Sequence, residues 1–384
     1  MEKLDQYLPT STALAAREIG VSVVICCHNS AKRLPETLAH LARQQVRNAS
    51  WEVIVVDNGS TDDTAEVARK CWPEHLNHFF RIVHESQLGL TYARKLGLQE
   101  AFYEFVCFVD DDNWLCETWI DDVLDVMSRH PEVAVCGGIN DAVTEIPAPR
   151  WFEFCRAMWA VSVDQPLTGD ITASGLSVCG AGLTLRQSAW RHLRSDRFEP
   201  LLTGRRGKSL VGNEDNELCF ALRLAGWRLW VEPRLKLKHF LPSGRLTWKY
   251  ARRLHRAAGF SGVGLDAYYY GALPKPSYVR ARLREVWWWQ ALTLLKRQAL
   301  GPLRFLRYTL TDSEGQHEAL FVDQELGRLA GLIRLRSDYS KAIAEVRSAR
   351  WRHSDRLQDP LAGAERNPAP VESEAVAVSQ REIS

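Results

Sequence analysis

Three adjacent carboxylates, Asp110, Asp111 and Asp112, follow the apolar run Phe105–Val109. In an open parallel sheet, ligands bind beyond the carboxyl ends of the strands, where the connecting loops meet. Neighbouring carboxylates repel one another unless a cation or hydrogen-bond donors neutralise them, and carboxylate oxygens suit Mg²⁺ or Mn²⁺. A solvated turn or a helix cap is the alternative for such a triplet. Its position at the end of a strand favours a divalent-cation site.

Polar residues also follow two other apolar runs near the N-terminus. Asp57 and Asn58 come directly after Trp51–Val56, and Asn29 follows Val21–Cys26. The first pair could form an ordinary strand-to-helix turn, or it could bind the base or ribose of a nucleotide, as acids at strand ends often do. Asn29 would line the same crevice, because parallel strands end at one edge of a sheet.

Three further residues toward the middle of the chain could carry chemistry. Glu214 and Asp215 precede a helical pattern and follow the glycine-rich stretch 204–212. Asp215 could cap that helix, or it could accept a proton from an attacking hydroxyl. His239 could be a structural histidine or a neutral imidazole that binds a metal. The residues alone leave both alternatives open at each position.

The elements that would position these residues alternate between strands and helices. Apolar β-branched runs predict strands, and apolar residues at i, i+3 and i+4 predict helices. We expect strands over 21–26, 51–56, 81–84, 105–109, 133–136 and 178–185, with helices between most of them. Strands that are apolar throughout, separated by amphipathic helices, indicate an α/β fold with a mostly parallel sheet covered by helices on both faces.

The pattern divides the chain into four segments. We expect an N-terminal extension (1–20), an α/β domain (21–240), a helical basic and aromatic region (241–350) and a disordered polar tail (353–384). The α/β domain consists of a first half (21–138) and a second half (139–240). Within the second half, the proline-containing stretch 140–177 is expected to face the substrate. In the helical region, one helix is predicted over 324–344.

The composition excludes several classes of protein. Basic minus acidic residues give 49 − 47 = +2, so no large single-sign field is available for a nucleic acid, and none is expected as a partner. The longest nearly apolar stretch, 286–295, is shorter than the ~20 residues of a membrane span, and no secretory signal is expected. Nine cysteines without a C-x-x-C pair predict a reduced cytoplasmic protein. P-loop, dinucleotide and serine-hydrolase motifs do not occur in the sequence.

Six motifs in a fixed order resemble a known family. They are V-S-V-V-I-x-x-x-N, V-D-N-G-S-T-D-D-T, G-L-T-Y-A-R, F-V-D-D-D-N, C-G-A-G-L-T-L-R and G-N-E-D-N-E-L-C-F-A-L-R-L-A-G-W. Together they are similar to the family 2 nucleotide-sugar glycosyltransferases, and they cover about residues 21–240. The resemblance implies a GT-A fold, with a Rossmann-like nucleotide-sugar-binding half (21–138), an acceptor half (139–240) and a helical C-terminal region. It is nearest to bacterial enzymes that assemble surface polysaccharides.

The resemblance also implies roles for the residues singled out above. A divalent cation, Mn²⁺ or Mg²⁺, would be bound by the outer positions of the D-x-D motif and by the downstream histidine. Asp215 matches the catalytic base, and Glu214 would support the acceptor loop. The expected metal ligands are Asp110, Asp112 and His239; the residues expected to bind the donor are Asn29, Asp57, Asn58, Arg94 and Asp111.

Two positions depart from the family pattern. The first strand often ends in Pro-Thr-Tyr-Asn, where this chain has Cys26-Cys27-His28-Asn29. The second motif often contains two aspartates, and Asn58 replaces the second of them here. An amide oxygen still accepts a hydrogen bond from a pyrimidine, but without the help of a charge. A UDP-sugar, the commonest donor in the family, remains the expectation.

The expected activity is therefore inverting, metal-assisted transfer of a sugar to a hydroxyl of a saccharide or a lipid-linked saccharide. A sugar nucleotidyltransferase is the alternative enzyme, although it would leave the Glu214-Asp215 helix without a task. A non-catalytic glycan-binding protein with the same fold is the third possibility. Unused clustered carboxylates would be unfavourable for such a protein.

Residues 241–310 contain thirteen Lys or Arg residues against two acids, together with the run Trp287–Trp289. Three successive tryptophans cannot all point inward, because neighbouring helical residues differ by about 100°. Aromatic and basic side chains together favour the interface of an anionic membrane. We expect peripheral contact of this region with the inner face of the cell membrane. An ordinary solvated helical face is the alternative.

Overall fold

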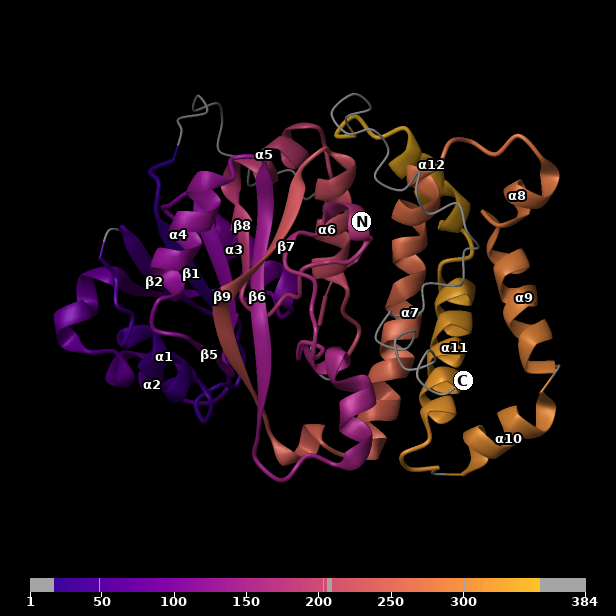
Figure 1. Cartoon of the computed structure of the whole chain (residues 1–384), viewed down its shortest axis with the longest axis horizontal. Helices are drawn as coiled ribbons and strands as arrows, with labels where there is room; N and C mark the ends of the chain where they lie inside the picture. The colour runs from indigo at the N-terminus through magenta and orange to yellow at the C-terminus, as the bar shows by residue number, and fades with distance from the viewer. Residues whose placement is uncertain are drawn as a thin grey trace.

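The computed structural model describes residues 17–47, 49–202, 204–205, 209–299, 301–311 and 313–352. Most of the predicted N-terminal extension and the whole predicted tail from residue 353 lie outside these ranges. The described residues form an α/β body and a layer of helices beside it (Figure 1).

The described strands form one nine-stranded sheet of order β3-β2-β1-β4-β8-β6-β9-β5, with β7 paired to β9. The strands are β1 (Val21–Cys27), β2 (Trp51–Asp57), β3 (Phe80–His84), β4 (Phe105–Asp110), β5 (Asn113–Leu115), β6 (Val133–Thr144), β7 (Gly169–Asp170), β8 (Leu183–Arg186) and β9 (Arg228–Leu241). All six predicted strands are present, although β8 begins later than expected.

The first half of the sheet is parallel and brings the polar strand ends to one edge. β1 pairs with β2 and β4, and β2 pairs with β3, all in parallel. Cys27 lies opposite Asp57, and Cys26 lies opposite Asp110. Beyond β4 the sheet is mixed, because β8 runs antiparallel to both β4 and β6, and β5 and β7 run antiparallel to β9. The predicted α/β class is confirmed, with the parallel pairs concentrated in the first half.

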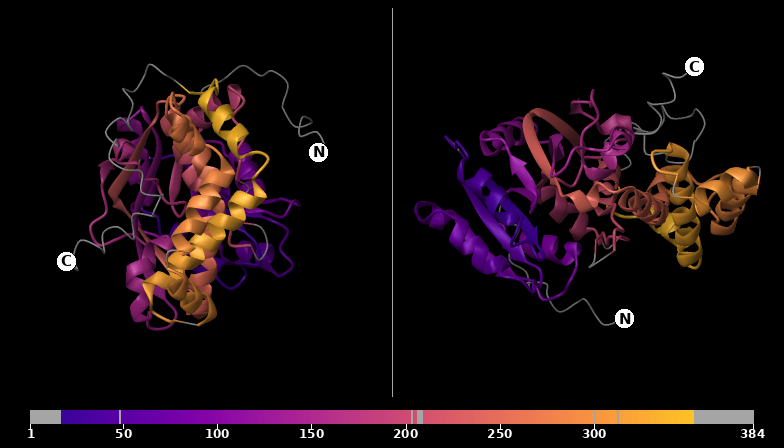
Figure 2. Two further views of the ribbon diagram at one scale, coloured as in Figure 1. Left: turned by 90° about the vertical axis from the view of Figure 1, so that its right-hand side faces the viewer. Right: turned by 90° about the horizontal axis from the view of Figure 1, so that it is seen from below.

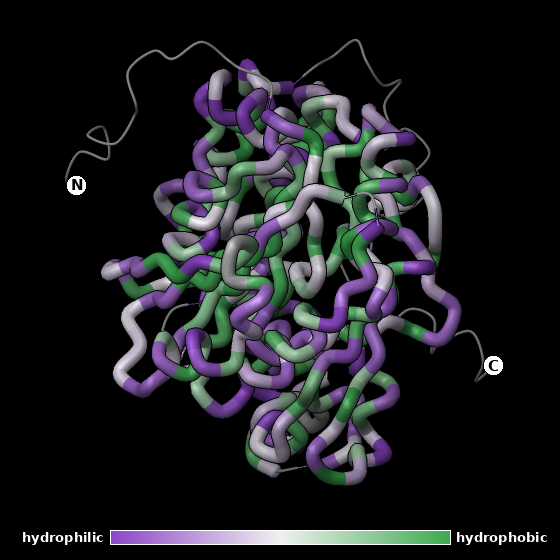
Figure 3. The backbone as a smooth tube through the Cα atoms, turned by 90° about the vertical axis from the view of Figure 1, so that its left-hand side faces the viewer, coloured by the Kyte–Doolittle hydropathy of each residue, from purple (hydrophilic) through white to green (hydrophobic). Residues whose placement is uncertain are grey.

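Helices cover both faces of the sheet, because successive strand residues point to opposite sides. Val23 and Val53 face α1, α2 and α4, whereas Val24 and Ile54 face α3, α5 and α6. Apolar segments gather inside this body and hydrophilic loops surround them (Figure 3). The helices are α1 (Leu34–Ala42), α2 (Thr64–Cys71), α3 (Leu90–Glu100), α4 (Trp119–Arg129), α5 (Gln187–Ser195) and α6 (Glu214–Leu224); a short 3-10 helix, η2 (Glu74–Phe79), precedes β3.

The helical region consists of α7 (Trp248–Ala272), α8 (Val279–Leu283), α9 (Trp287–Ala299), α10 (Pro302–Leu310), α11 (His317–Arg334) and α12 (Tyr339–Arg347). α7 and α11 lie side by side, with α8, α9 and α10 outside them (Figures 1 and 2). Asp323 of α11 is buried between Arg252 and Arg256 of α7 and pairs with both. Among the described residues, no helix is both long enough and apolar enough to cross a bilayer.

The single helix predicted over 324–344 is wrong, because α11 ends at Arg334 and α12 begins at Tyr339. The periodic apolar pattern continues through both helices and hides the break. The break turns Tyr339 toward α7, where its hydroxyl donates to Asp266 at 2.8 Å. Asp266 also pairs with Arg328 of α11 at 2.7 Å. A tertiary hydrogen bond to a buried carboxylate therefore accompanies the interruption.

The helices after residue 240 share a core with the α/β body. Tyr268 and Ile343 belong to the same buried cluster as Leu222 of α6. The stretch 140–177 forms the 3-10 helices η3 (Arg150–Trp159) and η4 (Thr172–Ser174), and Trp151 packs on Trp248 of α7 with ring centroids 5.3 Å apart. The C-terminal helices thus support the second half of the sheet.

The close approach of α7 and α11 depends on glycine. A Cβ atom on Gly327 would lie 1.9 Å from the carbonyl oxygen of Arg256, and one on Gly259 would lie 1.9 Å from that of Gln324. Backbone atoms cannot yield as a flexible side chain can, so the helices would have to separate. Gly262, also on α7, has nothing within 4 Å of its Cβ position.

We predict that Gly327→Ala lowers the free energy of unfolding by about 1–3 kcal/mol, the usual cost of overpacking. Gly262→Ala should leave it unchanged or raise it by about 0.5–1 kcal/mol, because alanine favours the helix. Urea unfolding of both variants would measure the difference. Equal stabilities would contradict a backbone contact between α7 and α11.

Candidate active site

The three carboxylates of the acidic triplet point to three different partners. β4 ends at Asp110, a two-residue turn holds Asp111 and Asp112, and β5 begins at Asn113. The side-chain oxygen of Asn113 accepts from the N–H of Asp110 at 3.0 Å and so closes the turn. Each of the three side chains therefore leaves the turn in its own direction.

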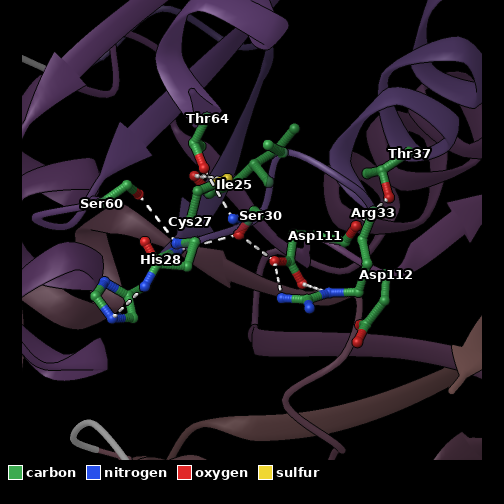
Figure 4. A network of polar contacts seen from close by, with 12 residues as sticks. Ile25, Cys27, His28, Ser30, Arg33, Thr37, Ser60, Thr64, Asp111 and Asp112 are labelled. Carbon is green, nitrogen blue, oxygen red and sulfur yellow. Dashed lines mark hydrogen bonds and ion pairs between the residues drawn. The ribbon is translucent and has the colours of Figure 1, made fainter. Parts of the chain in front are cut away.

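Asp111 is buried against the start of α1 (Figure 4). Arg33 donates to both of its oxygens, at 3.2 and 2.6 Å, and the Ser30 hydroxyl donates to one of them. Thr37 also donates to the Asp111 carbonyl at 2.9 Å. Burial and the neighbouring Asp112 raise the pKa of Asp111, although Arg33 opposes them. Asp111 is predicted to bind the donor; in the structure both of its carboxylate oxygens hold α1 to the turn.

Asp112 lies against β9 and the segment that follows this strand. Its Oδ2 lies 2.9 Å from a guanidinium nitrogen of Arg245, in the 3-10 helix η5 (Ser243–Arg245), and its Oδ1 lies 3.4 Å from Nε2 of His239 on β9. Burial alone would raise the pKa of Asp112, but His239 and Arg245 outweigh it and lower that pKa to about 2. Asp112 is therefore a buried carboxylate that keeps its charge.

Asp112 and His239 partly fit the predicted metal site. Nδ1 of His239 is buried without a hydrogen-bond partner among the described residues, whereas Nε2 lies 3.4 Å from Oδ1 of Asp112. A buried imidazole nitrogen without a partner is compatible with a bound ligand. Arg245, however, occupies one oxygen of Asp112. Within the part of the chain that the structure describes, no three His, Cys, Asp or Glu side chains gather around one point. The structure thus joins two predicted ligands and leaves Asp110 apart from them.

Asp110 interacts electrostatically with Arg94 of α3 instead. Burial disfavours the charge of Arg94, but Glu214, Asp110 and Asp215 together outweigh it and raise the pKa of Arg94. Arg94 donates to Oε1 of Glu214 at 3.1 Å and lies over the ring of Phe108. This ion pair links α3, in the first half of the sheet, to α6 in the second half.

Asp215 lies beside that ion pair at the start of α6. Its Oδ2 accepts from the N–H of Gly180 at 2.9 Å, and its Oδ1 accepts from the N–H of Asn216. A Cβ atom on Gly180 would lie 3.0 Å from Asp215 Oδ2 and 3.2 Å from Arg94, so glycine allows the close approach. Nε of Arg94 and Oε2 of Glu214 are buried without hydrogen-bond partners among the described residues. The Arg94–Glu214 ion pair therefore retains two unsatisfied polar atoms.

A cavity of about 160 Å³ is lined by Cys179 and Ala181, the residues on either side of Gly180, and by part of the stretch 140–177. Its wall is mostly apolar, with two hydroxyls, and includes Ser162, Leu167, Ile171, Ser177, Val178 and Cys179. The predicted substrate-facing stretch therefore lines a hollow next to the residue that holds Asp215.

Several positioning residues were missed by sequence reasoning. Glu217 accepts from the N–H groups of Leu201 and Leu202 and from the Tyr268 hydroxyl at 2.6 Å, and burial raises its pKa to about 7. It anchors the loop before α6 to α7. The acid one helical turn after Glu214 was a visible signal. No sequence pattern indicated the roles of Arg33, Arg245 and Gly180. Each of these residues contacts a partner that is distant in the sequence.

Two side chains, those of Asn29 and Asp57, hold the turn after β2 by accepting backbone N–H groups. Asn29, at a positive φ of 53°, accepts from the N–H of Thr61 at 2.8 Å and so joins the ends of β1 and β2. The carboxylate of Asp57 accepts from the N–H of Ser60 at 3.1 Å. Both residues lie at the predicted edge, where a nucleotide would bind.

The departure at Asn58 has a physical explanation in the structure. Its side-chain N–H₂ donates to the carbonyls of Glu85 and Gln87, at 3.1 and 2.7 Å, and its Oδ1 accepts from the N–H of Gly89 at 2.7 Å. A carboxylate cannot donate, so an aspartate would face two carbonyl oxygens. Asn58 therefore fastens the loop between β3 and α3, which leads to Arg94.

We predict that Asn58→Asp lowers the free energy of unfolding by at least about 1–3 kcal/mol, the cost of leaving a buried partner unsatisfied. Asp57→Asn is the matched control, because an amide oxygen can still accept from Ser60. Urea unfolding at neutral pH would compare them. If the two variants lost equal stability, the Asn58 amide would not be what holds the loop.

Comparison with known proteins supports the resemblance. Residues 22–185 match the model of Glycosyl transferase family 2. The chain is 32% identical over 109 residues to the poly(ribitol-phosphate) beta-N-acetylglucosaminyltransferase TarS of Staphylococcus aureus, covering 28% of this chain and 19% of TarS. It is 33% identical over 101 residues to the cholesterol galactosyltransferase of Borreliella burgdorferi, covering 26% and 27%. The chain thus matches less than a third of the length of either relative.

Among solved structures, the crystal structure of S. aureus TarS 1-349 matches with a TM-score of 0.44 at 16% identity, over 84% of this chain and 92% of that one. The matched family range, 22–185, contains β1 to β4, Arg94 and the acidic triplet. This part of the chain therefore resembles glycosyl transferase family 2, as its motifs indicate.

Proposed function

We propose that the chain is an inverting glycosyltransferase that moves a sugar from a nucleotide-sugar to a hydroxyl of a saccharide or lipid-linked saccharide. The observation that carries the proposal is the position of Asp215. Its carboxylate is held by Gly180, beside the Arg94–Glu214 pair and next to a cavity. The family match of residues 22–185 supports a nucleotide-sugar donor, and a UDP-sugar remains the expected one.

Asp215 is the proposed general base. Each of its oxygens accepts one backbone N–H, which fixes the carboxylate and leaves a lone pair on each oxygen. It takes the proton of the acceptor hydroxyl as that oxygen attacks the anomeric carbon, opposite the departing nucleoside diphosphate. A single displacement inverts the anomeric configuration.

The donor side of the proposal rests on the remaining strand ends. Asn29 and Asp57 lie where the base and ribose would bind, and Asn58 orders the loop behind them. Asp112 and His239, with Asp110 as a further candidate, would hold a divalent cation, Mn²⁺ or Mg²⁺. Such a cation neutralises charge on the departing diphosphate. For binding through both oxygens of Asp112, Arg245 must first release Oδ2.

A donor screen tests the proposal directly. Purified chain is incubated with nucleotide-sugars, a saccharide acceptor and Mn²⁺ or a chelator, and release of nucleoside diphosphate is measured. We expect release from one donor class, dependence on the cation, and a product whose anomeric configuration is inverted by NMR. Pyrophosphate release would instead indicate a nucleotidyltransferase, and retained configuration would exclude the single displacement.

We predict that Asp215→Asn reduces turnover by about 10²–10⁴-fold, the usual contribution of a general base. Donor affinity should be unchanged, because the base acts on the acceptor. Asp338→Asn, at an exposed aspartate of the helical region, is the matched control and should keep full activity. Equal loss of donor binding and turnover in Asp215→Asn would mean that Asp215 only supports Gly180 and α6.

A further inference from the structure

Helix α9 has two apolar faces, and only one of them is covered. Ala291 and Leu294 are buried, and Trp287 packs on the same core. A second apolar stripe on the same helix is exposed. It consists of Trp288, Leu292 and Leu295, at positions i, i+4 and i+7, which are 46%, 51% and 51% exposed. A surface helix normally places polar side chains there. The second stripe is therefore an apolar face without a partner in the described structure.

The neighbouring helix also carries exposed leucines. Leu306 and Leu310 of α10 are 50% and 77% exposed, one helical turn apart. α9 and α10 belong to the layer farthest from the sheet, outside α7 and α11 (Figure 1). We call Trp288, Leu292, Leu295, Leu306 and Leu310 the outer apolar face. Clustered exposure of this kind marks an interaction site more often than scattered single residues do.

The charge around the outer apolar face is one-sided. Residues 273–311 contain eight Lys or Arg residues and a single acid, Glu285. Glu285 is already paired with Arg347 at 2.6 Å. Lys296 on α9, Arg284 just before it and Arg307 on α10 are exposed. The surroundings of the apolar stripe are therefore positive, and a complementary partner must be negative.

We propose that the outer apolar face docks on the surface of an anionic lipid bilayer without crossing it. Leucine and tryptophan enter the interfacial layer, and the basic side chains contact lipid phosphates. A nucleic acid would pair with the basic side chains but leave the leucines exposed to water. An uncharged apolar partner would cover the leucines but leave the basic side chains without anions. The proposal concerns binding rather than turnover, so it does not depend on the proposed function.

Vesicle co-sedimentation of the full chain tests the proposal. We expect binding to vesicles of phosphatidylcholine mixed with phosphatidylglycerol, little binding to phosphatidylcholine alone, and weaker binding at high salt. The double variant Leu292→Ser/Leu295→Ser should lose about tenfold or more in bound fraction at limiting lipid. Lys296→Glu should weaken binding to anionic vesicles as well.

Phe102→Ser is the matched control, because Phe102 is an exposed apolar residue, at 56%, in the first half of the chain. It should bind like the unmodified chain, and thermal unfolding by circular dichroism should show that all variants remain folded. Equal recovery of the unmodified chain with neutral and anionic vesicles would overturn the proposal. Self-association in the absence of lipid that the double variant abolishes would assign the face to a second copy of the chain instead.

Discussion

The repulsion between three adjacent carboxylates is the constraint on which the site depends. The two-residue turn between β4 and β5 separates them, and each approaches a cationic side chain from a different element. Arg33 of α1 pairs with Asp111, Arg245 of η5 pairs with Asp112, and Arg94 of α3 lies near Asp110. Neutralising the charges therefore also fixes three separate segments against one edge of the sheet.

Ion pairing also connects the two halves of the sheet. Arg94 pairs across to Glu214, and the following residue, Asp215, is held by Gly180. Glu217, in the same helix, ties the preceding loop to Tyr268 of α7. The start of α6 is thus fixed from three directions. A carboxylate that must meet an incoming hydroxyl in one orientation benefits from such a rigid support.

The C-terminal helices have two different surfaces. Their inner side completes the core beneath α6, and α7 and α11 touch so closely that glycine is required at Gly259 and Gly327. Their outer side carries exposed leucines among basic residues. Removing these helices would therefore expose core as well as remove the outer apolar face, and the site is best studied in the full chain.

The sequence by itself determined which segments of the first half form strands, the edge at which the polar residues gather, and the family resemblance, because buried strands and their terminal motifs are local patterns. It could not decide which carboxylates stay free. Asp111 is paired internally, Asn58 serves the backbone, and Asp112 shares its charge with Arg245, more than a hundred residues away. It also missed the break after Arg334. These outcomes depend on side-chain directions and on partners distant in the chain, which only the packed structure brings together.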